Sequence, residues 1–531
     1  MSTSLESEWE HARETLAALY QDDRAQRLAW ALAYARRCLD QPLLIGRYLP
    51  GWLTLLNHAN ESLDLHEMAL ELITLLHQTV INLGRFVEWE AQVRFAIEVC
   101  ARTGRVIQQA EFLERLANIL YWSGHFEASQ TTAEQSLEVA RKANNARTLA
   151  IGTRALVGVQ ITRAQTAAAR ALLEATKVDP LVQGANGVEQ AWVMAQLCTY
   201  EARVRRAEGG PGALLKAAHL SDEAISWLQR FPTVDPALEA DICRNRGVHH
   251  WQVDHYDEAI SLLRRAAHLF RQQHNPFDQR LVEGTLGLVH WSKGQLRQAE
   301  HYMRRSAQAA KHLNERWHFA RQMGNLALVS LFRGRLSEAQ RRVEMHCHLA
   351  EQLGVKMEYS RARCNRGIIA FHRGKYSAAL PDLDFDRLYL EKDYPDNEGL
   401  VPTYVNLAGC HAAMGDLDEA RMQVDKAMRI TNLTGLASLR IITLRALAEC
   451  FPPEDRQSPI EPLCEALELA EHTGRLIDIA GCSFSLAHLT GIGRLWERGV
   501  AVLCQMDATA WLCDESGGYS IERPPRLPSV T

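Results

Sequence analysis

The chain has 531 residues, of which 47% are hydrophobic and 23% are charged, and its formal net charge is −5. This composition is typical of a folded globular protein and excludes a disordered chain. The small negative charge argues against a protein that binds nucleic acid through electrostatics.

The cysteines and the N-terminus indicate a reducing compartment. The twelve cysteines are scattered singly and form no C-x-x-C pair, which argues against a zinc knuckle or a thioredoxin-type motif. We expect buried, reduced thiols, as in a cytoplasmic protein. No window approaches 18 uninterrupted apolar residues, so we expect no membrane span and no membrane partner. The polar, acidic start MSTSLESEWEHARE is unlike a secretory signal.

The first part of the chain is predicted to be helical, with repeats that become clearer along the sequence. Residues 1–82 form an N-terminal helical region with degenerate repeats, and residues 83–206 contain repeats of a more regular kind. Residues 207–239 are expected to be an irregular repeat with loops at EGGPG (208–212) and FPTVDP (231–236).

Residues 240–430 hold the most regular repeats. Five segments align there: VDHYDEAI, KGQLRQAE, RGRLSEAQ, RGKYSAAL and MGDLDEAR. Their alanines are 40, 40, 40 and 41 residues apart, and they are Ala259, Ala299, Ala339, Ala379 and Ala420. Such self-similarity is the signature of a repeat architecture. Beyond it, residues 431–513 form degenerate C-terminal repeats. Residues 514–531, with Gly-Gly and three prolines, are an expected disordered tail.

Each repeat is predicted to be two helices joined by a tight turn. In one unit, apolar residues recur at helical spacing over 280–293, and a second helical face runs over 295–312. The small residue early in the second helix allows the two helices to cross closely. The repeats also share glycines, in the first helix (Gly247, Gly287, Gly367) and at the turn (Gly294, Gly334, Gly374, Gly415). Strand signals are almost absent.

These positions resemble the tetratricopeptide repeat (TPR) family. Leu286-Gly287 with Gly294 and Ala299 match its pattern, as do Arg366-Gly367 with Gly374, Tyr376 and Ala379. The resemblance implies an all-α fold, a right-handed α-solenoid of helical hairpins. The 40-residue period exceeds the family's 34, and such long units resemble the sensor regions of bacterial STAND-type signalling proteins.

No motif for catalysis, metal or cofactor binding is found. Gly374-Lys375 is followed by Tyr and lacks the upstream glycine of a phosphate-binding loop. No His-Glu-x-x-His occurs. His346 and His348 are two residues apart and therefore point to different helix faces. We expect no catalytic residue, no metal and no cofactor.

One pattern suggests a binding groove. In TPR-like repeats the first helices line the concave side, and Arg or Lys at position two with Asn at position six resembles a dicarboxylate clamp that grips a peptide C-terminus. Arg321–Asn325 and Arg361–Asn365 are two consecutive copies. A guanidinium binds a carboxylate bidentately, and amides bind peptide backbone. The candidate partner-binding residues are Arg321, Asn325, Arg361, Asn365, Asn406, Arg244 and Trp251.

Two interpretations of these residues stay open. The alternative to a clamp, which we favour, is that the position-six Asn residues bond the neighbouring helix and stabilise the stacking of repeats. The following repeat also departs from the clamp pattern, because it carries Pro402 and Asn406.

The sequence therefore predicts a non-catalytic TPR scaffold that binds a protein or peptide partner in its concave groove. The long units favour the sensor or regulatory subunit of a bacterial signalling system. The alternatives are an all-helical enzyme of the toroidal glycosidase type and an RNA-binding helical-repeat protein. The short loops and the lack of a basic groove argue against both, and no direct nucleic-acid partner is expected.

Overall fold

The computed structural model describes residues 23–39, 42–60, 62–163, 165–209, 212–230, 235–313, 315–354, 356–393, 397–512 and 525–528. Most residues in these ranges are helical and none of them forms a β-strand, so the predicted all-α solenoid is confirmed. The chain divides into two compact units, residues 1–159 with 178–185 and residues 160–177 with 186–531. Each unit is described by itself. Residues 1–22 of the predicted N-terminal helical region lie outside the described residues.

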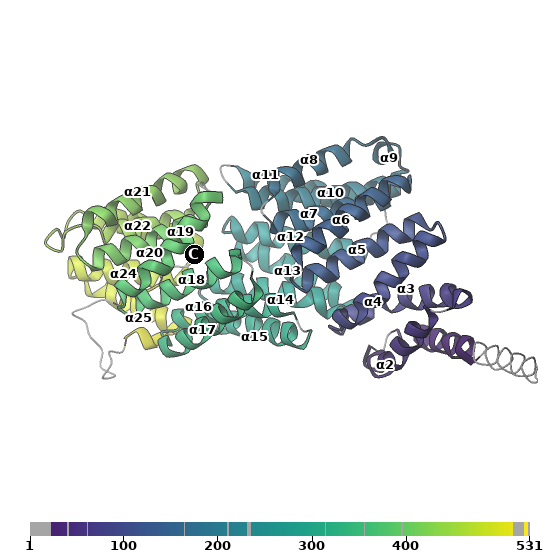
Figure 1. The fold of residues 1–531 in the computed structure, drawn as a ribbon. Helices are drawn as coiled ribbons and strands as arrows, with labels where there is room; N and C mark the ends of the chain where they lie inside the picture. Colours follow the sequence, from purple (N-terminus) through teal and green to yellow (C-terminus); the bar gives the residue numbers. More distant parts are fainter. Residues whose placement is uncertain are drawn as a thin grey trace, which may run out of the picture. The chain divides into compact units, whose positions relative to one another are not determined.

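The first unit is a series of helices, and those between residues 42 and 142 contact one another in chain order. At the position where regular repeats carry alanine, it has Trp89, which is fully buried and donates its indole N–H to Nδ1 of His77 at 3.2 Å. Ser129 takes the same position one repeat later and is also fully buried. The elements are a helix at 23–37, α2 (Pro42–Ala59), η1 (Leu63–Leu65), α3 (His66–Asn82), α4 (Phe86–Arg102), α5 (Val106–Trp122), α6 (Phe126–Lys142), most of α7 (Ala146–Thr162) and α9 (Pro180–Gln183) (Figure 1).

The second unit consists of α8 and of hairpins that pair each even-numbered helix from α10 onward with the next odd-numbered one. Its elements are α8 (Thr166–Lys177), α10 (Gly187–Glu208), α11 (Ala213–Gln229), α12 (Pro236–Gln252), α13 (Tyr256–Gln272), α14 (Pro276–Ser292), α15 (Leu296–His312), α16 (Arg316–Phe332), α17 (Leu336–Leu353), α18 (Lys356–His372), α19 (Tyr376–Asp393), α20 (Leu400–Ala413), α21 (Leu417–Thr434), α22 (Ala437–Ala448), α23 (Ile460–Thr473), α24 (Leu476–Thr490), α25 (Gly493–Met506) and η2 (Thr509–Leu512).

The repeated small residues lie where the two helices of a hairpin cross. The alanines at 259, 299, 339, 379 and 420 are all fully buried. A Cβ on Gly287 would lie 2.6 Å from Met303 Cγ and 3.3 Å from the carbonyl oxygen of Ala299. Gly247 and Gly367 make the equivalent close approach in their own repeats. The alanine and glycine period therefore reflects close helix crossing, as expected.

The turns between first and second helices require a left-handed residue. Gly294, Gly334, Gly374 and Gly415 have φ between +72° and +86°, a region that glycine enters without a steric penalty. Asp254 holds the same turn position with φ +63°. Its carboxylate accepts hydrogen bonds from the Tyr256 hydroxyl (2.8 Å) and from the backbone N–H of Ser438 (3.0 Å), in the first turn of α22.

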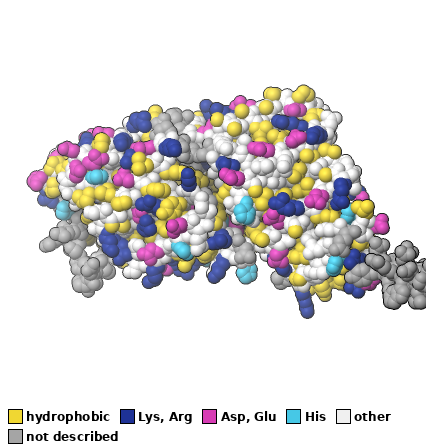
Figure 2. Space-filling model, viewed as in Figure 1, with side chains coloured by type: hydrophobic (Ala, Val, Ile, Leu, Met, Phe, Trp, Pro, Cys, Tyr) yellow, Lys and Arg dark blue, Asp and Glu magenta, His cyan; other side chains and the backbone are white. Residues whose placement is uncertain are grey.

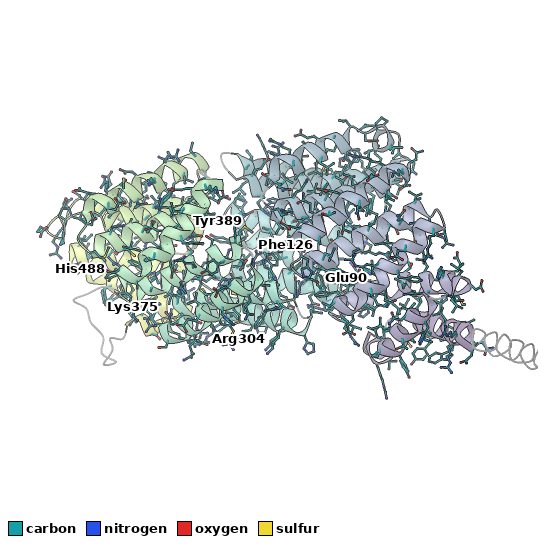
Figure 3. The ribbon with its side chains drawn as sticks, in the orientation of Figure 1. Glu90, Phe126, Arg304, Lys375, Tyr389 and His488 are labelled. Carbon is teal, nitrogen blue, oxygen red and sulfur yellow. The ribbon has the colours of Figure 1, made fainter. Side chains whose placement is uncertain are left out.

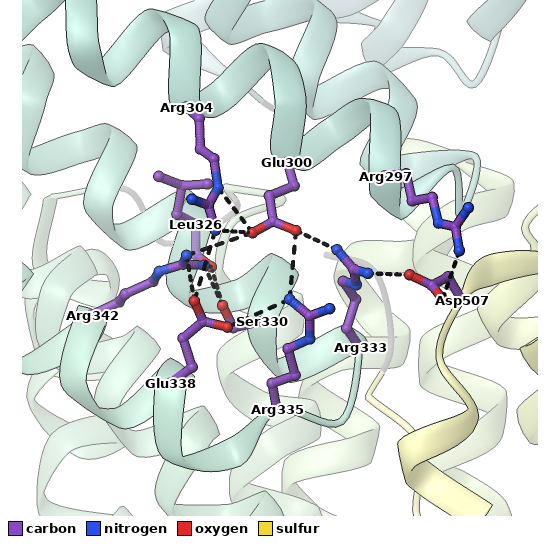
Figure 4. A network of polar contacts seen from close by, with 10 residues as sticks. All are labelled: Arg297, Glu300, Arg304, Leu326, Ser330, Arg333, Arg335, Glu338, Arg342 and Asp507. Carbon is purple, nitrogen blue, oxygen red and sulfur yellow. Dashed lines mark hydrogen bonds and ion pairs between the residues drawn. The ribbon is translucent and has the colours of Figure 1, made fainter.

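The C-terminal hairpin packs against the turns of earlier repeats in the same unit. Asp507, which follows α25, pairs with Arg333 and lies 3.1 Å from Arg297 (Figure 4). The Trp511 indole donates to the carbonyl oxygen of Phe332 at 3.1 Å. Arg333 also joins the polar network around Glu300, which includes Arg304, Arg335, Glu338 and Arg342. These contacts fix the end of α25 and η2 onto α15 and the end of α16.

The surface carries charges of both signs. Basic and acidic side chains are interspersed over the visible face (Figure 2), and the exposed side chains of Arg304, Lys375 and His488 come from different hairpins (Figure 3). Among the described residues, no helix is long and apolar enough to cross a membrane.

Candidate functional site

The first helices of the second unit share one side of the solenoid. Successive first helices contact one another from α10 through α24, whereas no pair of successive second helices makes comparable contact among the described residues. In a curved solenoid, the helices that lie closer to one another are on the inner side. The first helices are closer together than the second helices and therefore form this inner side. This inner side is called the concave face below, and its central part is formed by α16, α18 and α20.

Arg321 of α16 and Arg361 of α18, the two predicted clamp arginines, lie around one buried carboxylate. Arg321 Nη2 is 3.3 Å and Arg361 Nη1 is 3.5 Å from Oε2 of Glu358, whose side chain is fully buried. Its other oxygen, Oε1, lies 3.0 Å from Nε2 of His346. The Arg321 guanidinium also stacks on Trp317, 4.0 Å from the ring centre. Glu358 was not anticipated from the sequence.

The charges around Glu358 compensate its burial. Burial raises the pKa of this carboxyl, but Arg321, Arg361 and His346 outweigh burial and hold the pKa below its usual range. Glu358 is therefore ionised at neutral pH. Two guanidiniums, which are cationic at neutral pH, thus share this carboxylate.

The histidine pair of the second helix α17 is divided as the spacing predicts. His346 is buried against Glu358, whereas His348 is exposed and lies 2.8 Å from the Gln352 side chain. Among the described residues, no group of three or more His, Cys, Asp or Glu side chains is arranged to hold a metal ion.

The position-six side chains make contacts within and between first helices. Asn245 and Asn406 donate to the carbonyl oxygens of Asp241 and Pro402, four residues earlier, each at 2.8 Å. Asn325 lies 3.4 Å from the Gln322 side chain. Asn365 is buried against the preceding first helix, and a Cβ on Gly324 would lie 3.1 Å from its Nδ2. Asn245, Asn325 and Asn406 thus bond within their own helices, which neither the clamp nor the stacking interpretation anticipated, and Asn365 packs against a neighbouring helix.

The remaining two candidates, Arg244 and Trp251, contact the next repeat. Arg244 pairs with Asp241 and lies 3.6 Å from Asp278 of α14. Burial lowers the pKa of Arg244, but both carboxylates outweigh it and raise the pKa. Trp251 donates its indole N–H to Ser292 Oγ at 2.9 Å. Both residues therefore hold adjacent repeats together.

The part of the concave face between α18, α20 and α22 is filled by residues near the end of the chain. Residues 525–528, which fall in the expected disordered tail, are packed against α18, α20 and α22, while the rest of residues 514–531 lies outside the described residues. Leu527 is 3% exposed. A cavity of only about 40 Å³ remains here. A composition rich in proline could not reveal this contact, because it depends on His372 and Arg445, far away in sequence.

A larger cavity lies beside α11 and α12. It has a volume of about 450 Å³, and its lining combines Leu214, Leu215, Ala218 and Leu436 with polar residues such as Arg246 and His249. Burial, with Arg206 and His250, lowers the pKa of His249 to about 3, so this imidazole is neutral. The cavity suits a small apolar molecule better than a charged one.

The hairpins and their shared concave face define the class of this molecule, a TPR-like helical solenoid. No protein-family model and no curated protein matches its sequence. Among solved structures, the fold is similar to a Rap protein complexed with competence and sporulation factor, with 14% identity, a TM-score of 0.52 and coverage of 68% of this chain and 97% of that one.

Two further solved structures are similar over a comparable length. One is NprR in complex with its cognate peptide NprX (13% identity, TM-score 0.46, 66% of this chain and 98% of that one). The other is a STAND protein with a tetratricopeptide repeat sensor from Pyrococcus horikoshii (11% identity, TM-score 0.44, 70% and 53%). At these identities the likeness concerns the fold alone.

Proposed function

We propose that this chain is a non-catalytic regulatory solenoid that binds an extended peptide or protein segment along the concave face of α16, α18 and α20. The observation that carries the proposal is that the adjoining part of the concave face, between α18, α20 and α22, already holds a peptide segment by its main chain. The carbonyl oxygens of Arg526 and Leu527 lie 3.2 Å from His372 Nδ1 and 2.9 Å from Arg445 Nη2. Solenoids use such inner surfaces for extended ligands.

The arginine pair gives this face a place for a carboxylate. The side chains of Arg321 and Arg361 are 28% and 42% exposed, and Glu358 orients both. Arg361 reaches Glu358 through Nη1, and a guanidinium has further N–H donors in a planar fork that suits carboxylates. We propose that the pair binds an acidic side chain or the C-terminal carboxylate of the partner.

The proposed role is the sensor or regulatory subunit of a bacterial signalling system whose catalytic activity belongs to another chain. Repeats of this length and the absence of a phosphate-binding loop support that role. The cysteines among the described residues are all unpaired, which is typical of a reducing compartment such as the cytoplasm. Two of the similar structures are complexes, one with competence and sporulation factor and one with the peptide NprX. A signalling peptide is therefore the first ligand class to test.

The test is affinity selection of a random peptide library with free C-termini on the full chain, followed by titration of the selected peptide. Losing one charge-assisted contact costs about 1.5–3 kcal/mol, so the double change Arg321→Ala and Arg361→Ala is expected to weaken binding about a hundredfold or more. Arg341→Ala, an exposed arginine on the second helix α17, is the matched control and should leave the affinity unchanged.

Amidation of the selected peptide tests the same contact without altering the protein. If the arginines bind the C-terminal carboxylate, the amidated peptide should bind the unaltered chain as weakly as the free peptide binds the double variant. A peptide that binds all of these forms equally would contradict the role of the arginine pair.

A further inference from the structure

The C-terminal residues 525–528 are bound in the manner of a peptide ligand. Arg445 donates from Nη2 to the Leu527 carbonyl oxygen at 2.9 Å, and His372 Nδ1 lies 3.2 Å from the Arg526 carbonyl oxygen, a contact that requires the Nδ1–H tautomer. The Leu527 N–H bonds back to the carbonyl oxygen of Pro525 at 2.9 Å, which closes a three-residue turn. The carbonyl oxygens of Arg526 and Leu527 are thus both bound by side chains of the concave face.

The two side chains between the prolines are recognised differently. Leu527 is 3% exposed and belongs to the same apolar cluster as Phe371 of α18 and Phe484 of α24. The Arg526 guanidinium lies 5.2 Å from the centre of the Phe371 ring and 3.1 Å from Oε2 of Glu449. The site therefore recognises an arginine followed by a leucine. The arginine is bound through its charge and a cation–π contact, and the leucine is bound by burial.

The receiving site is built by groups that are themselves fixed. Arg445 is held by Asp478, a fully buried carboxylate whose Oδ1 lies 2.5 Å from Arg445 Nη1. Its guanidinium passes over Gly481, where a Cβ would lie 2.5 Å from Nη2. Gly409 similarly makes room for Phe371, which would lie 2.7 Å from a Cβ there. These glycines allow the donor and the aromatic ring to occupy their places before any segment binds.

The attachment of the tail is nevertheless limited. The contacts of the described tail residues are two hydrogen bonds to their carbonyl oxygens, the burial of Leu527 and Pro528, the cation–π contact of Arg526, and an ion pair whose partners, Arg526 and Glu449, are 36% and 37% exposed. Exposed ion pairs contribute little to stability. A tethered segment gains mainly from its effective concentration, which is on the order of millimolar for a short tether, so a free segment of similar chemistry can compete.

We infer that residues 525–528 are a ligand in cis for the concave face, which a partner segment carrying an Arg–Leu pair displaces. The inference rests on the proposed function, because it names the ligand chemistry and the regulation of that face. Without a partner, the tail fills the concave face between α18, α20 and α22. A partner segment must therefore compete with the tail for this site.

The test uses the full chain and a fluorescent synthetic peptide with the sequence of residues 519–531, YSIERPPRLPSVT, measured by fluorescence anisotropy. The parent chain should bind this peptide weakly, since its own tail occupies the site. Leu527→Asp removes the tail from the apolar pocket and should tighten peptide binding at least tenfold. Leu388→Asp, the same change at an exposed position of α19, is the matched control and should bind as the parent does.

Two more changes keep the test decisive if Leu527→Asp perturbs folding. Arg526→Glu alters a partly exposed residue only and should tighten peptide binding severalfold. His372→Phe, added to Leu527→Asp, keeps an aromatic ring at position 372 but removes the hydrogen-bond donor. The double variant should bind the peptide about fivefold or more weakly than Leu527→Asp alone, a loss typical of one hydrogen bond. A peptide in which the leucine is replaced by aspartate should not bind any form.

The inference is overturned if the peptide binds the parent and both tail variants equally, or binds none of them. If affinity-selected peptides still bind through Arg321 and Arg361 in that case, the proposed function stands and only the role of the tail is wrong. If no selected peptide binds even to the Leu527→Asp chain, the proposed function itself fails.

Discussion

Two adjacent alanines of α19 provide a test of the helix-crossing argument. Ala379 is fully buried where α19 crosses α18, and its carbonyl oxygen lies 3.2 Å from the point where a Cβ on Gly367 would be. Ala378 is exposed. Leucine at position 379 has no room unless the hairpin opens, and overpacking of this kind costs about 1–3 kcal/mol. Leucine at position 378 should change the stability by about 0.5 kcal/mol at most.

The assay is urea unfolding of the full chain followed by far-UV circular dichroism. Because a chain of two units does not unfold in one cooperative step, hydrogen exchange of the α18 and α19 amides should accompany it. We expect Ala379→Leu to lower the unfolding midpoint and to speed exchange in this hairpin, and Ala378→Leu to do neither. Equal stability of the two variants and the parent would refute the assignment of Ala379 to the crossing point.

Three further predictions concern buried charge and backbone strain. Glu358→Gln leaves two arginines without their carboxylate and should destabilise the chain by about 3 kcal/mol in urea unfolding, whereas Glu344→Gln, exposed on α17, should be neutral. Burial lowers the pKa of His77 and His249 to about 3. Below pH 6.5 protons therefore bind these histidines in the unfolded state but not in the folded state, and the free energy of unfolding decreases as the pH is lowered. Each histidine should lower the free energy of unfolding by about 2 kcal/mol at pH 5 relative to pH 7. A urea midpoint that is constant from pH 7 to 5 would contradict this. Gly334→Ala should destabilise more than Gly374→Ala in the same assay, because both have φ above +70° but only a Cβ at 334 meets Ala510, at 2.9 Å.

The repeat architecture could be predicted because its cause is local and repeated. Each hairpin needs a small residue at the crossing and a left-handed turn, so Ala299 and Gly294 recur with a constant period. The helices expected at 280–293 and 295–312 correspond to α14 and α15. Departures from the pattern have individual solutions, such as Trp89, which fills the small-residue position with a bond to His77.

The binding face could be predicted only in part. Arg321 and Arg361 were found from their spacing, but the carboxylate that orients them, Glu358, is defined by contacts between repeats. The site for the tail is less local still. Arg445 reaches Leu527 because Gly481 of another hairpin leaves space, and no periodic signal encodes such a contact.

Hydrogen–deuterium exchange of the full chain, with and without an affinity-selected peptide, tests the central claim most directly, because it locates the bound segment. The proposed function predicts that protection on binding is concentrated in the first helices α16, α18 and α20, and that the protection in α16 and α18 is lost when Arg321 and Arg361 are replaced by alanine. Protection confined to the second helices α17, α19 and α21, or to the first unit, would contradict a partner on the concave face.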